Sequence, residues 1–353
     1  MVTIALQTKW RATIPLPPRH RTMEDFARAS GISRPTLSKY FDDPDSVRPA
    51  TRHRIEAALA QSDYRPNPFA RNLNRRRART IGIVVPTVAD PFYAALVARV
   101  EARCSAGGYW PLVLSSRGEA EGEALALQTL LDQRVAGALV ASCGADALAR
   151  QAEEVGRRVP LVFLDSPAGE GAGFVGNDNR QSIAALVDYL VESGETPAYL
   201  DMPDVNASAR ARRASYVARM QELGLEPVLI PAPGGGWEFE RLGFEAMEAM
   251  MATGAPSFHA VLCANDRLAL GALASAFARG MRVGREAGAS LRIAGHDDHP
   301  LSRYACPALT TVAQDVEGLA SQGTQMLLGA IRNAEGPADR VLLPARLTLR
   351  ASA

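Results

Sequence analysis

Six arginines lie between positions 65 and 79, in the stretch RPNPFARNLNRRRAR, which contains no acidic residue. Like charges this dense repel one another unless an anionic partner lies against them. A lone leucine, Leu73, stands among the arginines, and the residues that follow, TIGIVVP, are apolar enough to form a buried strand. The segment therefore predicts contact with a polyanion, directly before a globular domain.

The formal charge of the chain changes sign at the same place. Residues 1–79 hold sixteen Lys/Arg against seven Asp/Glu, a net charge of +9, and residues 80–353 hold twenty-three against thirty-one, a net charge of −8. Neutralisation of phosphates by Lys and Arg drives non-specific binding to nucleic acid. We therefore expect a nucleic-acid partner at the N-terminal module only; the alternative is an ordinary basic surface.

The elements that would present this charge are short helices. In TMEDFARASGISRPTLSKYF, Thr22 can cap a first helix, Gly31 supplies a turn, and Ser33 can cap a second helix. A third amphipathic helix is predicted from about Pro49 to Gln61. Two helices joined by a glycine turn form a helix-turn-helix, whose second helix enters the major groove of double-stranded DNA.

On that geometry, the start of the second helix carries the residues that contact DNA. Arg34 and Pro35, and Lys39 one turn later, are expected to face the major groove. Thr36 and Ser38 are expected near phosphates. Pro35 brings no side-chain donor to its position.

After residue 80 the chain alternates short apolar runs with amphipathic helices. Runs rich in Val, Ile and Leu without alternation indicate strands of a parallel sheet that is buried on both faces. Two sets of such strands predict two doubly wound subdomains, with a small-ligand cleft at the carboxyl edges of their strands. The predicted strands are 81–86, 110–116, 137–142 and 160–165 in the first set, and 197–202, 226–231, 258–264 and 290–298 in the second.

Enzyme and metal signatures are missing from this part. No phosphate-binding loop, nucleophile elbow or dinucleotide fingerprint occurs, and the only lysines, Lys9 and Lys39, precede it, which excludes a Schiff-base lysine in the cleft. The run HDDH at 296–299 lacks an evident third metal-binding group, and the four cysteines show no C-x-x-C spacing. We expect no catalytic residue, no cofactor and no metal.

Nor does the sequence indicate a membrane protein. No apolar run approaches the roughly 18 residues needed to span a bilayer, and the N-terminus lacks the pattern of a signal peptide. A soluble, cytoplasmic protein is expected, with residues 1–21 forming a disordered extension.

The order of these motifs, from TMEDFARASGISRPTLSKYF to YRPNPFARNLNRRRARTIGIVVP and on to about residue 350, resembles the lactose-repressor (LacI/GalR) family of bacterial transcription regulators. The resemblance implies a homodimer on a near-palindromic operator, with a hinge helix at 67–74 that is ordered on DNA. Asn67, Ala70, Arg71 and Leu73 would contact DNA there, Leu73 as a wedge between base pairs in the minor groove.

The same resemblance places an effector, such as a sugar, in the cleft of a periplasmic-binding-protein-like α/β domain. It extends to DPFY at the first strand, to an arginine in SARARRASY, and to the motif AND-x-x-A-x-G. The implied effector-binding residues are Asp90, Phe92, Tyr93, Asp165, Ser208, Arg212, Trp237, Asn265 and Asp297. Carboxylates and amides around one arginine suit a polyol, because each buried hydroxyl needs a partner. Simpler roles remain open: Asn265 and Asp266 as helix caps, Asp298 as a turn residue, and Phe92 as core.

The predicted domains are a helix-turn-helix domain at 22–66, a hinge and linker at 67–79, and an effector and dimerisation domain at 80–353. Within the last, the first subdomain is expected at about 80–177 and 310–338, and the second at about 178–309 and 339–350. The leading prediction is a repressor whose operator affinity a sugar or polyol controls. The alternatives are the same regulator with a purine or other non-sugar corepressor, a solute-binding protein without a DNA role, and a sugar-processing enzyme.

Overall fold

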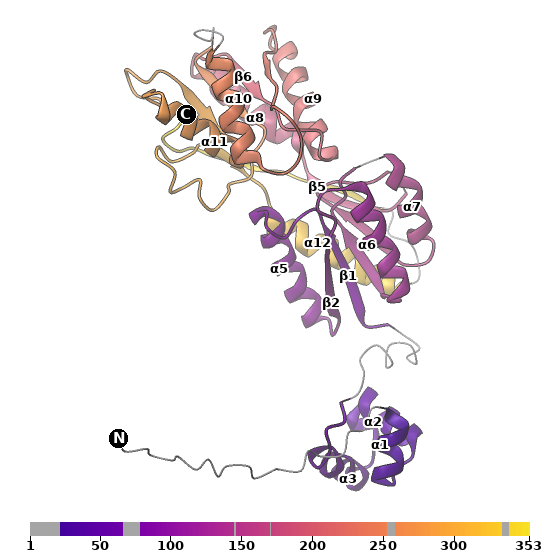
Figure 1. Ribbon diagram of the computed structural model, residues 1–353. Coiled ribbons are helices and arrows are strands. Elements are labelled where there is room, and N and C mark those ends of the chain that lie inside the picture. Colours follow the sequence, from indigo (N-terminus) through magenta and orange to yellow (C-terminus); the bar gives the residue numbers. More distant parts are fainter. Residues whose placement is uncertain (1–21, 66–77, 145, 170, 253–257, 334–338) are drawn as a thin grey trace, which may run out of the picture. The chain divides into compact units, whose positions relative to one another are not determined.

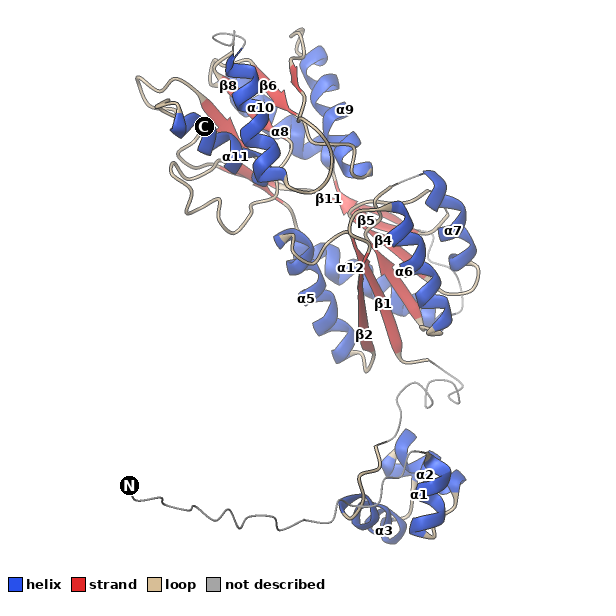
Figure 2. Cartoon of the chain, in the orientation of Figure 1, coloured by secondary structure: helices blue, strands red, loops and turns tan. Residues whose placement is uncertain are grey.

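The computed structural model describes residues 22–65, 78–144, 146–169, 171–252, 258–333 and 339–353 (Figures 1 and 2). The chain forms two compact units, Met1–Arg76 and Arg77–Ala353. The first unit is all-helical in its described part, and the second combines helices with parallel sheets.

In the described part of the first unit, three α-helices surround a small core: α1 (Met23–Ser30), α2 (Arg34–Asp42) and α3 (Pro49–Ala60). The two predicted caps are confirmed, since Thr22 Oγ1 accepts a hydrogen bond from the Asp25 amide at 3.1 Å and Ser33 Oγ accepts one from the Thr36 amide at 3.4 Å. Gly31 between α1 and α2 has a φ of 65°, in the left-handed region that favours glycine. These helices form the predicted helix-turn-helix.

The core of this unit consists of a few large apolar side chains. The rings of Phe26 and Tyr64 are stacked with their centroids 4.7 Å apart, which ties the chain after α3 to α1. The other buried members of the cluster are Ile32, Leu37, Val47 and Ile55. A core this small holds three helices together but leaves most of their surface exposed.

The first subdomain of the second unit is a parallel sheet covered by helices on both faces (Figure 1). Its strand order is β11-β5-β4-β3-β1-β2. One face packs against α5 and α12 through a cluster around Leu96, Val100 and Leu327, and the other packs against α6 and α7 through a cluster around Leu127, Leu130 and Leu148. The bounds are β1 (Thr80–Val85), α5 (Pro91–Ala106), β2 (Trp110–Ser115), α6 (Ala120–Asp132), β3 (Gly137–Val140), α7 (Asp146–Gly156), β4 (Leu161–Leu164), β5 (Gly173–Asn177), α12 (Val316–Asn333) and β11 (Arg340–Leu343).

The second subdomain repeats the design with a smaller parallel sheet in the order β7-β6-β8-β9. Helix α8 packs on α9 and α10 on α11, and the stacked rings of Tyr199 and Tyr216, 4.9 Å apart, join β6 to α9. An antiparallel pair, β10 with β12, completes the subdomain. The bounds are α8 (Asn179–Glu192), β6 (Pro197–Leu200), α9 (Ala207–Glu222), β7 (Leu229–Ile230), α10 (Phe239–Ala252), β8 (Ala260–Cys263), α11 (Asp266–Ala278), β9 (Arg292–Ala294), β10 (Thr311–Ala313) and β12 (Arg346–Thr348).

The structure corrects the predicted subdomain boundaries near the C-terminus. The final strand, expected as one element of the second subdomain, is two strands: β11 pairs in parallel with β5 of the first sheet, and β12 pairs with β10. Pro344 separates them, because proline has no N–H to continue a ladder. Residues 310–313, expected in the first subdomain, join the second, since Thr310 bridges Ala294 at the end of β9. The chain thus crosses between the subdomains after β5, after β10 and after β11.

Among the described residues, no helix combines the length and the apolar character required to cross a membrane.

Candidate ligand-binding site

A cavity lies between the subdomains of the second unit, at the carboxyl ends of their strands. Its free volume of about 40 Å³ is far below the roughly 300–1,000 Å³ typical of small-ligand sites, so the cleft is closed to less than the size of a ligand. All nine predicted effector-binding residues line it: Asp90, Phe92, Tyr93, Asp165, Ser208, Arg212, Trp237, Asn265 and Asp297. The structure therefore brings together residues that lie as far as 207 positions apart in the sequence.

The strand ends explain this convergence. Asp165 follows β4 and Asp297 follows β9, with φ values of 62° and 121°. Residues other than glycine rarely adopt a positive φ, and such strain is concentrated at functional sites. At both positions the positive φ ends the extended backbone of the strand, and the carboxylate lies at the edge of the cavity.

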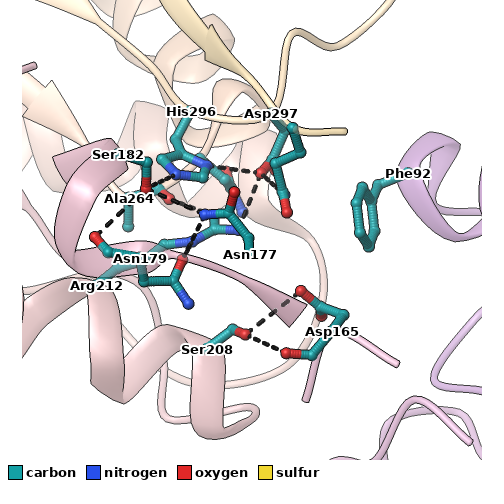
Figure 3. Close-up of polar contacts among 12 residues, drawn as sticks. Phe92, Asp165, Asn177, Asn179, Ser182, Ser208, Arg212, Ala264, His296 and Asp297 are labelled. Carbon is teal, nitrogen blue, oxygen red and sulfur yellow. Dashed lines mark hydrogen bonds and ion pairs between the residues drawn. The ribbon is translucent and has the colours of Figure 1, made fainter. Parts of the chain in front are cut away.

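Arg212 of α9 is the most tightly held charge of the cavity, with only 5% of its surface exposed. Its Nη2 pairs with Asp297 Oδ1 at 3.0 Å, its Nη1 donates to the Ala264 carbonyl at 2.8 Å, and its Nε donates to Asn179 Oδ1 at 3.2 Å (Figure 3). The guanidinium is fixed in place before any ligand arrives, because each of its three nitrogens has a protein partner.

Asp297 is held by an equally dense set of donors, all on one oxygen. Its Oδ1 receives Arg212, His296 Nδ1 at 2.9 Å and Gln314 Nε2 at 2.6 Å. Burial raises the pKa of Asp297, but the charge of Arg212 and the hydrogen bond from His296 lower it, and the pKa lies below its usual value. These three contacts all fall on Oδ1, and Asp297 lines the cavity, so its ionised carboxylate can also accept a hydrogen bond from a ligand.

Behind Asp297, a buried hydrogen-bond chain has the order of a catalytic triad. His296 Nε2 lies 2.9 Å from Ser182 Oγ, and its Nδ1 bonds Asp297 (Figure 3). Burial and the charge of Arg212 lower the pKa of His296 to about 4, so the ring is neutral at pH 7. Ser182 and His296 are completely buried and neither lines the cavity, so no substrate could reach the serine. This series of hydrogen bonds orients the Asp297 carboxylate instead.

On the opposite wall, Asp165 links the two subdomains. Tyr93 Oη donates to Asp165 Oδ2 at 3.0 Å, and Ser208 Oγ, from α9, donates to the Asp165 carbonyl at 2.8 Å. Asn206 Nδ2 lies 3.4 Å from Tyr93 Oη. Burial raises the pKa of Asp165 to about 6, so the group is an ionised acceptor above that pH.

The aromatic residues and Gln314 supply the apolar surface and the unsatisfied polar atoms of the cavity. The ring of Trp237 lies 5.9 Å from that of Tyr93 and 5.5 Å from that of Phe239. Trp237 Nε1, a donor, and Gln314 Oε1, an acceptor, are buried without a hydrogen-bond partner. A buried polar atom left unpaired costs roughly 1–3 kcal/mol. Trp237 Nε1 packs against Gly118, whereas Gln314 lines the cavity, so a ligand donor such as a hydroxyl can satisfy Gln314 Oε1.

Three polar residues around the cavity also have structural roles. Asn265 caps α11 by accepting from the Leu268 amide at 2.8 Å, and it lines the cavity as well. Asp266 is fully buried and binds Ser302 Oγ and the His299 amide, which holds the loop after β9. Asp298 pairs with Arg350 at 2.6 Å. The capping role considered for Asn265 is thus confirmed and coexists with its place in the cavity, whereas Asp266 is the first residue of α11 and does not cap it. Asp298 has a positive φ of 52°, as a turn residue can.

Several residues in and beside the site were not predicted from the sequence. Arg267, directly after the AND motif, pairs with Asp90 Oδ2 at 3.0 Å. Asn206 caps α9, and Gln314 follows β10. The cap pattern before α9 could have revealed Asn206, but the contacts of Arg267 and Gln314 join segments far apart in the sequence, and no local pattern reports them.

In the described part of the chain, no group of three or more His, Cys, Asp or Glu side chains is placed to hold a metal ion. The HDDH run has other partners: the side chains of His296 and Asp298 bind protein groups, as does the His299 backbone amide.

The predicted DNA-contacting residues of the first unit lie on one helix where the structure describes them. Arg34, Pro35 and Lys39 on α2 are exposed, whereas Thr36 and Ser38 are half-buried. The predicted hinge residues Asn67, Ala70, Arg71 and Leu73 lie outside the described residues.

Comparison with known families matches both units. Residues 22–67 match the model of bacterial regulatory proteins of the lacI family, and residues 187–353 match the model of the periplasmic binding protein-like domain. The HTH-type transcriptional repressor CytR of Escherichia coli (strain K12) is 28% identical over 335 residues, which cover 94% of this chain and 96% of that protein. The ribose operon repressor of the same strain is 28% identical over 334 residues, which cover 94% of this chain and 99% of that protein.

Solved structures give the same result. A lac repressor dimer bound to operator and the anti-inducer ONPF superimposes with a TM-score of 0.81 at 28% identity and covers 95% of this chain and 99% of that chain. A complex of the transcriptional regulator CelR with cellobiose superimposes with a TM-score of 0.68 at 27% identity and covers 95% of this chain and 100% of that chain. The similarity therefore spans both units and the cavity.

Proposed function

Because the chain belongs to the LacI family of bacterial regulatory proteins and is a DNA-binding repressor of that family, we propose that a small sugar or related polyol in the cavity controls its affinity for an operator. The protein acts as a homodimer on a near-palindromic site in the cytoplasm. Helix α2 reads the major groove through Arg34, Pro35 and Lys39, and the residues around Leu73 contact the minor groove.

The observation that carries the proposed effector is the hydrogen-bonding balance of the cavity. Each nitrogen of Arg212 has a protein partner, and its charge is balanced by Asp297, so the cavity offers little attraction to an anionic group. The remaining groups are carboxylate oxygens and one unpaired acceptor beside aromatic rings. Hydroxyls on a compact ring fit this set. The ribose operon repressors and the CelR complex with cellobiose, both similar to this chain, support a sugar.

Similarity to a known dimer supports the homodimer. The lac repressor that superimposes on this chain was solved as a dimer, so a second copy is the partner that we assign. The second unit exposes large apolar side chains in both subdomains, Trp110 in the first and Phe277, Leu301 and Tyr304 in the second.

A thermal-shift screen tests the effector. A ligand that binds only the folded protein stabilises it by mass action and so raises the unfolding temperature. At a ligand concentration of 100 Kd, the apparent free energy of unfolding increases by about 2.7 kcal/mol. We expect neutral mono- or disaccharides to shift the transition more than their phosphate esters, because the one cavity arginine is already neutralised. A shift by purine bases alone would favour the corepressor alternative. Equal response to sugar phosphates would contradict a neutral ligand.

Binding to DNA is tested separately, by gel shift on the DNA upstream of the protein's own gene at several salt concentrations. Turnover of the sugars that bind would instead indicate an enzyme, against the burial of Ser182 and His296.

A further inference from the structure

We infer that Arg267 is a latch residue that holds the cleft closed over its ligand, by pairing across the two subdomains with Asp90. The effect on a ligand rests on the proposed function of the cavity. The latch itself is a property of the chain alone.

Arg267 is anchored on its own subdomain by two kinds of contact. Its Nε and Nη2 make a forked ion pair with Glu240, in the first turn of α10, at 2.8 and 2.7 Å. Its guanidinium lies over the ring of Phe239, 5.1 Å from the centroid. These contacts fix the plane of the guanidinium and leave Nη1 pointing away from them, since a forked pair uses two of the three nitrogens.

Nη1 is the atom that reaches the other subdomain. It lies 3.0 Å from Asp90 Oδ2, and Asp90 Oδ1 is held in turn by the Phe92 amide at 2.9 Å as the cap of α5. Only 17% of the Arg267 side chain and 9% of the Asp90 side chain are exposed. Two pre-oriented groups, each fixed to a different subdomain, therefore meet where water is largely excluded. Such a pair resists separation more than a surface pair does.

The bridge lies beside two neighbouring spaces. The cavity and a second pocket share four lining residues, Asp90, Phe92, Asp297 and Gln314, and of these two spaces Arg267 lines only the second. Asp90 and Phe92 therefore form part of the wall of both spaces. With the bridge made, that wall is tied to α11; with the bridge broken, it can move with the first subdomain.

Two substitutions and one matched control separate a latch from a local stabilising contact. Arg267→Ala removes the bridge and the pair with Glu240. Asp90→Asn removes the charge of the bridge, keeps a side chain that caps helices well, and leaves the Arg267–Glu240 pair intact. Arg279→Ala is the control: Arg279 makes the same kind of forked pair with Glu248, at 3.0 and 2.9 Å between the same two helices, and has no bond to the first subdomain among the described contacts.

Hydrogen exchange can report closure at a place remote from the substitutions. The Ala207 amide, at the start of α9, donates to Ser166 Oγ of the first subdomain at 3.1 Å. This bond breaks when the subdomains separate. Exchange at Ala207, followed in the protein without any ligand or DNA, therefore measures opening, and the amides of β8 in the core of the second subdomain provide the internal reference.

We expect Arg267→Ala and Asp90→Asn each to speed exchange at Ala207 by about five-fold or more relative to β8, as the loss of a part-buried charged hydrogen bond implies. Arg279→Ala should leave this ratio at the wild-type value. The inference is overturned if Asp90→Asn is silent, if Arg279→Ala has the same effect, or if Ala207 and β8 accelerate equally. Since the experiment contains neither effector nor operator, its failure leaves the proposed function standing, and failure of the sugar screen leaves the latch standing.

Discussion

The two units of the chain treat positive charge in opposite ways. In the first unit, Arg34 and Lys39 stand exposed on α2 above a core of six buried apolar side chains. In the second unit, Arg212 is 5% exposed and bonded at all three nitrogens. Exposed cations remain available to bind the phosphates of DNA, and this binding is favourable because it releases counterions that were condensed on the DNA. A buried cation must be satisfied within the protein, so it orients its neighbours for a neutral ligand instead of attracting a charged one.

The largest expected effect comes from removing the buried cation of the second unit. Arg212→Ala should lower the free energy of unfolding of the second unit by about 3–5 kcal/mol, because it leaves the Asp297 carboxylate buried without its cation. It should also abolish the thermal shift by any sugar that stabilises the wild type. Chemical denaturation and the ligand screen measure both effects.

The neighbouring Arg213 provides the control on the same helix. Its side chain is 37% exposed and pairs at 2.5 Å with Asp201, whose side chain is 11% exposed. Because only one of the two charges is buried, Arg213→Ala should cost about 1–2 kcal/mol, less than Arg212→Ala, and keep the ligand response. Equal losses for the two variants would show that burial of Arg212 has no special role.

The next effect concerns pH. Because burial raises the pKa of Asp165 to about 6 from its ordinary 3.8, the folded protein binds this proton more tightly than the unfolded chain. The contribution of Asp165 to stability is therefore greatest below pH 4 and declines as the pH rises from about 4 to about 6. Asp165→Asn, which keeps an acceptor for Tyr93, should gain about 2–3 kcal/mol of stability relative to wild type over that window. A constant difference between the two proteins from pH 4 to pH 7 would contradict the buried, proton-binding state of Asp165.

The smallest expected effect comes from removing an exposed cation of the first unit. Lys39→Ala should weaken operator binding by about 1–2 kcal/mol and affect unrelated DNA much less, because a base contact carries sequence information and a phosphate contact does not. Binding isotherms on the two DNAs measure the difference. Arg158, exposed in the second unit and paired with Glu154 at 2.8 Å, supplies the control, and Arg158→Ala should change neither isotherm.

Much of this arrangement could be predicted from the sequence, because local rules decide it. Thr22 and Ser33 cap their helices through hydrogen bonds to an amide only three residues away. The apolar runs predicted at 81–86 and 137–142 form β1 and β3. The ligand residues converge for a topological reason: in parallel sheets all carboxyl ends meet at one edge, so polar residues after successive strands become neighbours.

The remainder depends on tertiary context. Strand β5, GFVGN, carries two glycines and has low strand propensity, and it forms because β4 and β11 pair with it on both sides. After Pro344, β12 pairs with β10, and Arg267 pairs with Asp90. Both pairings depend on contacts between segments that are far apart along the chain. The chain from Asp297 through His296 to Ser182 joins the loop after β9 to α8, and adjacent letters in the sequence do not reveal it.

The central claim is that occupancy of the cavity changes the affinity of the first unit for DNA. The most direct measurement is the anisotropy of a labelled operator duplex titrated with the full chain, with and without a saturating concentration of the sugar that gives the largest thermal shift, at two salt concentrations. We predict operator affinity that falls steeply with salt and that changes by about 5- to 150-fold when the sugar is present, the range of a coupling free energy of about 1–3 kcal/mol. Identical isotherms with the cavity filled and empty would contradict the account.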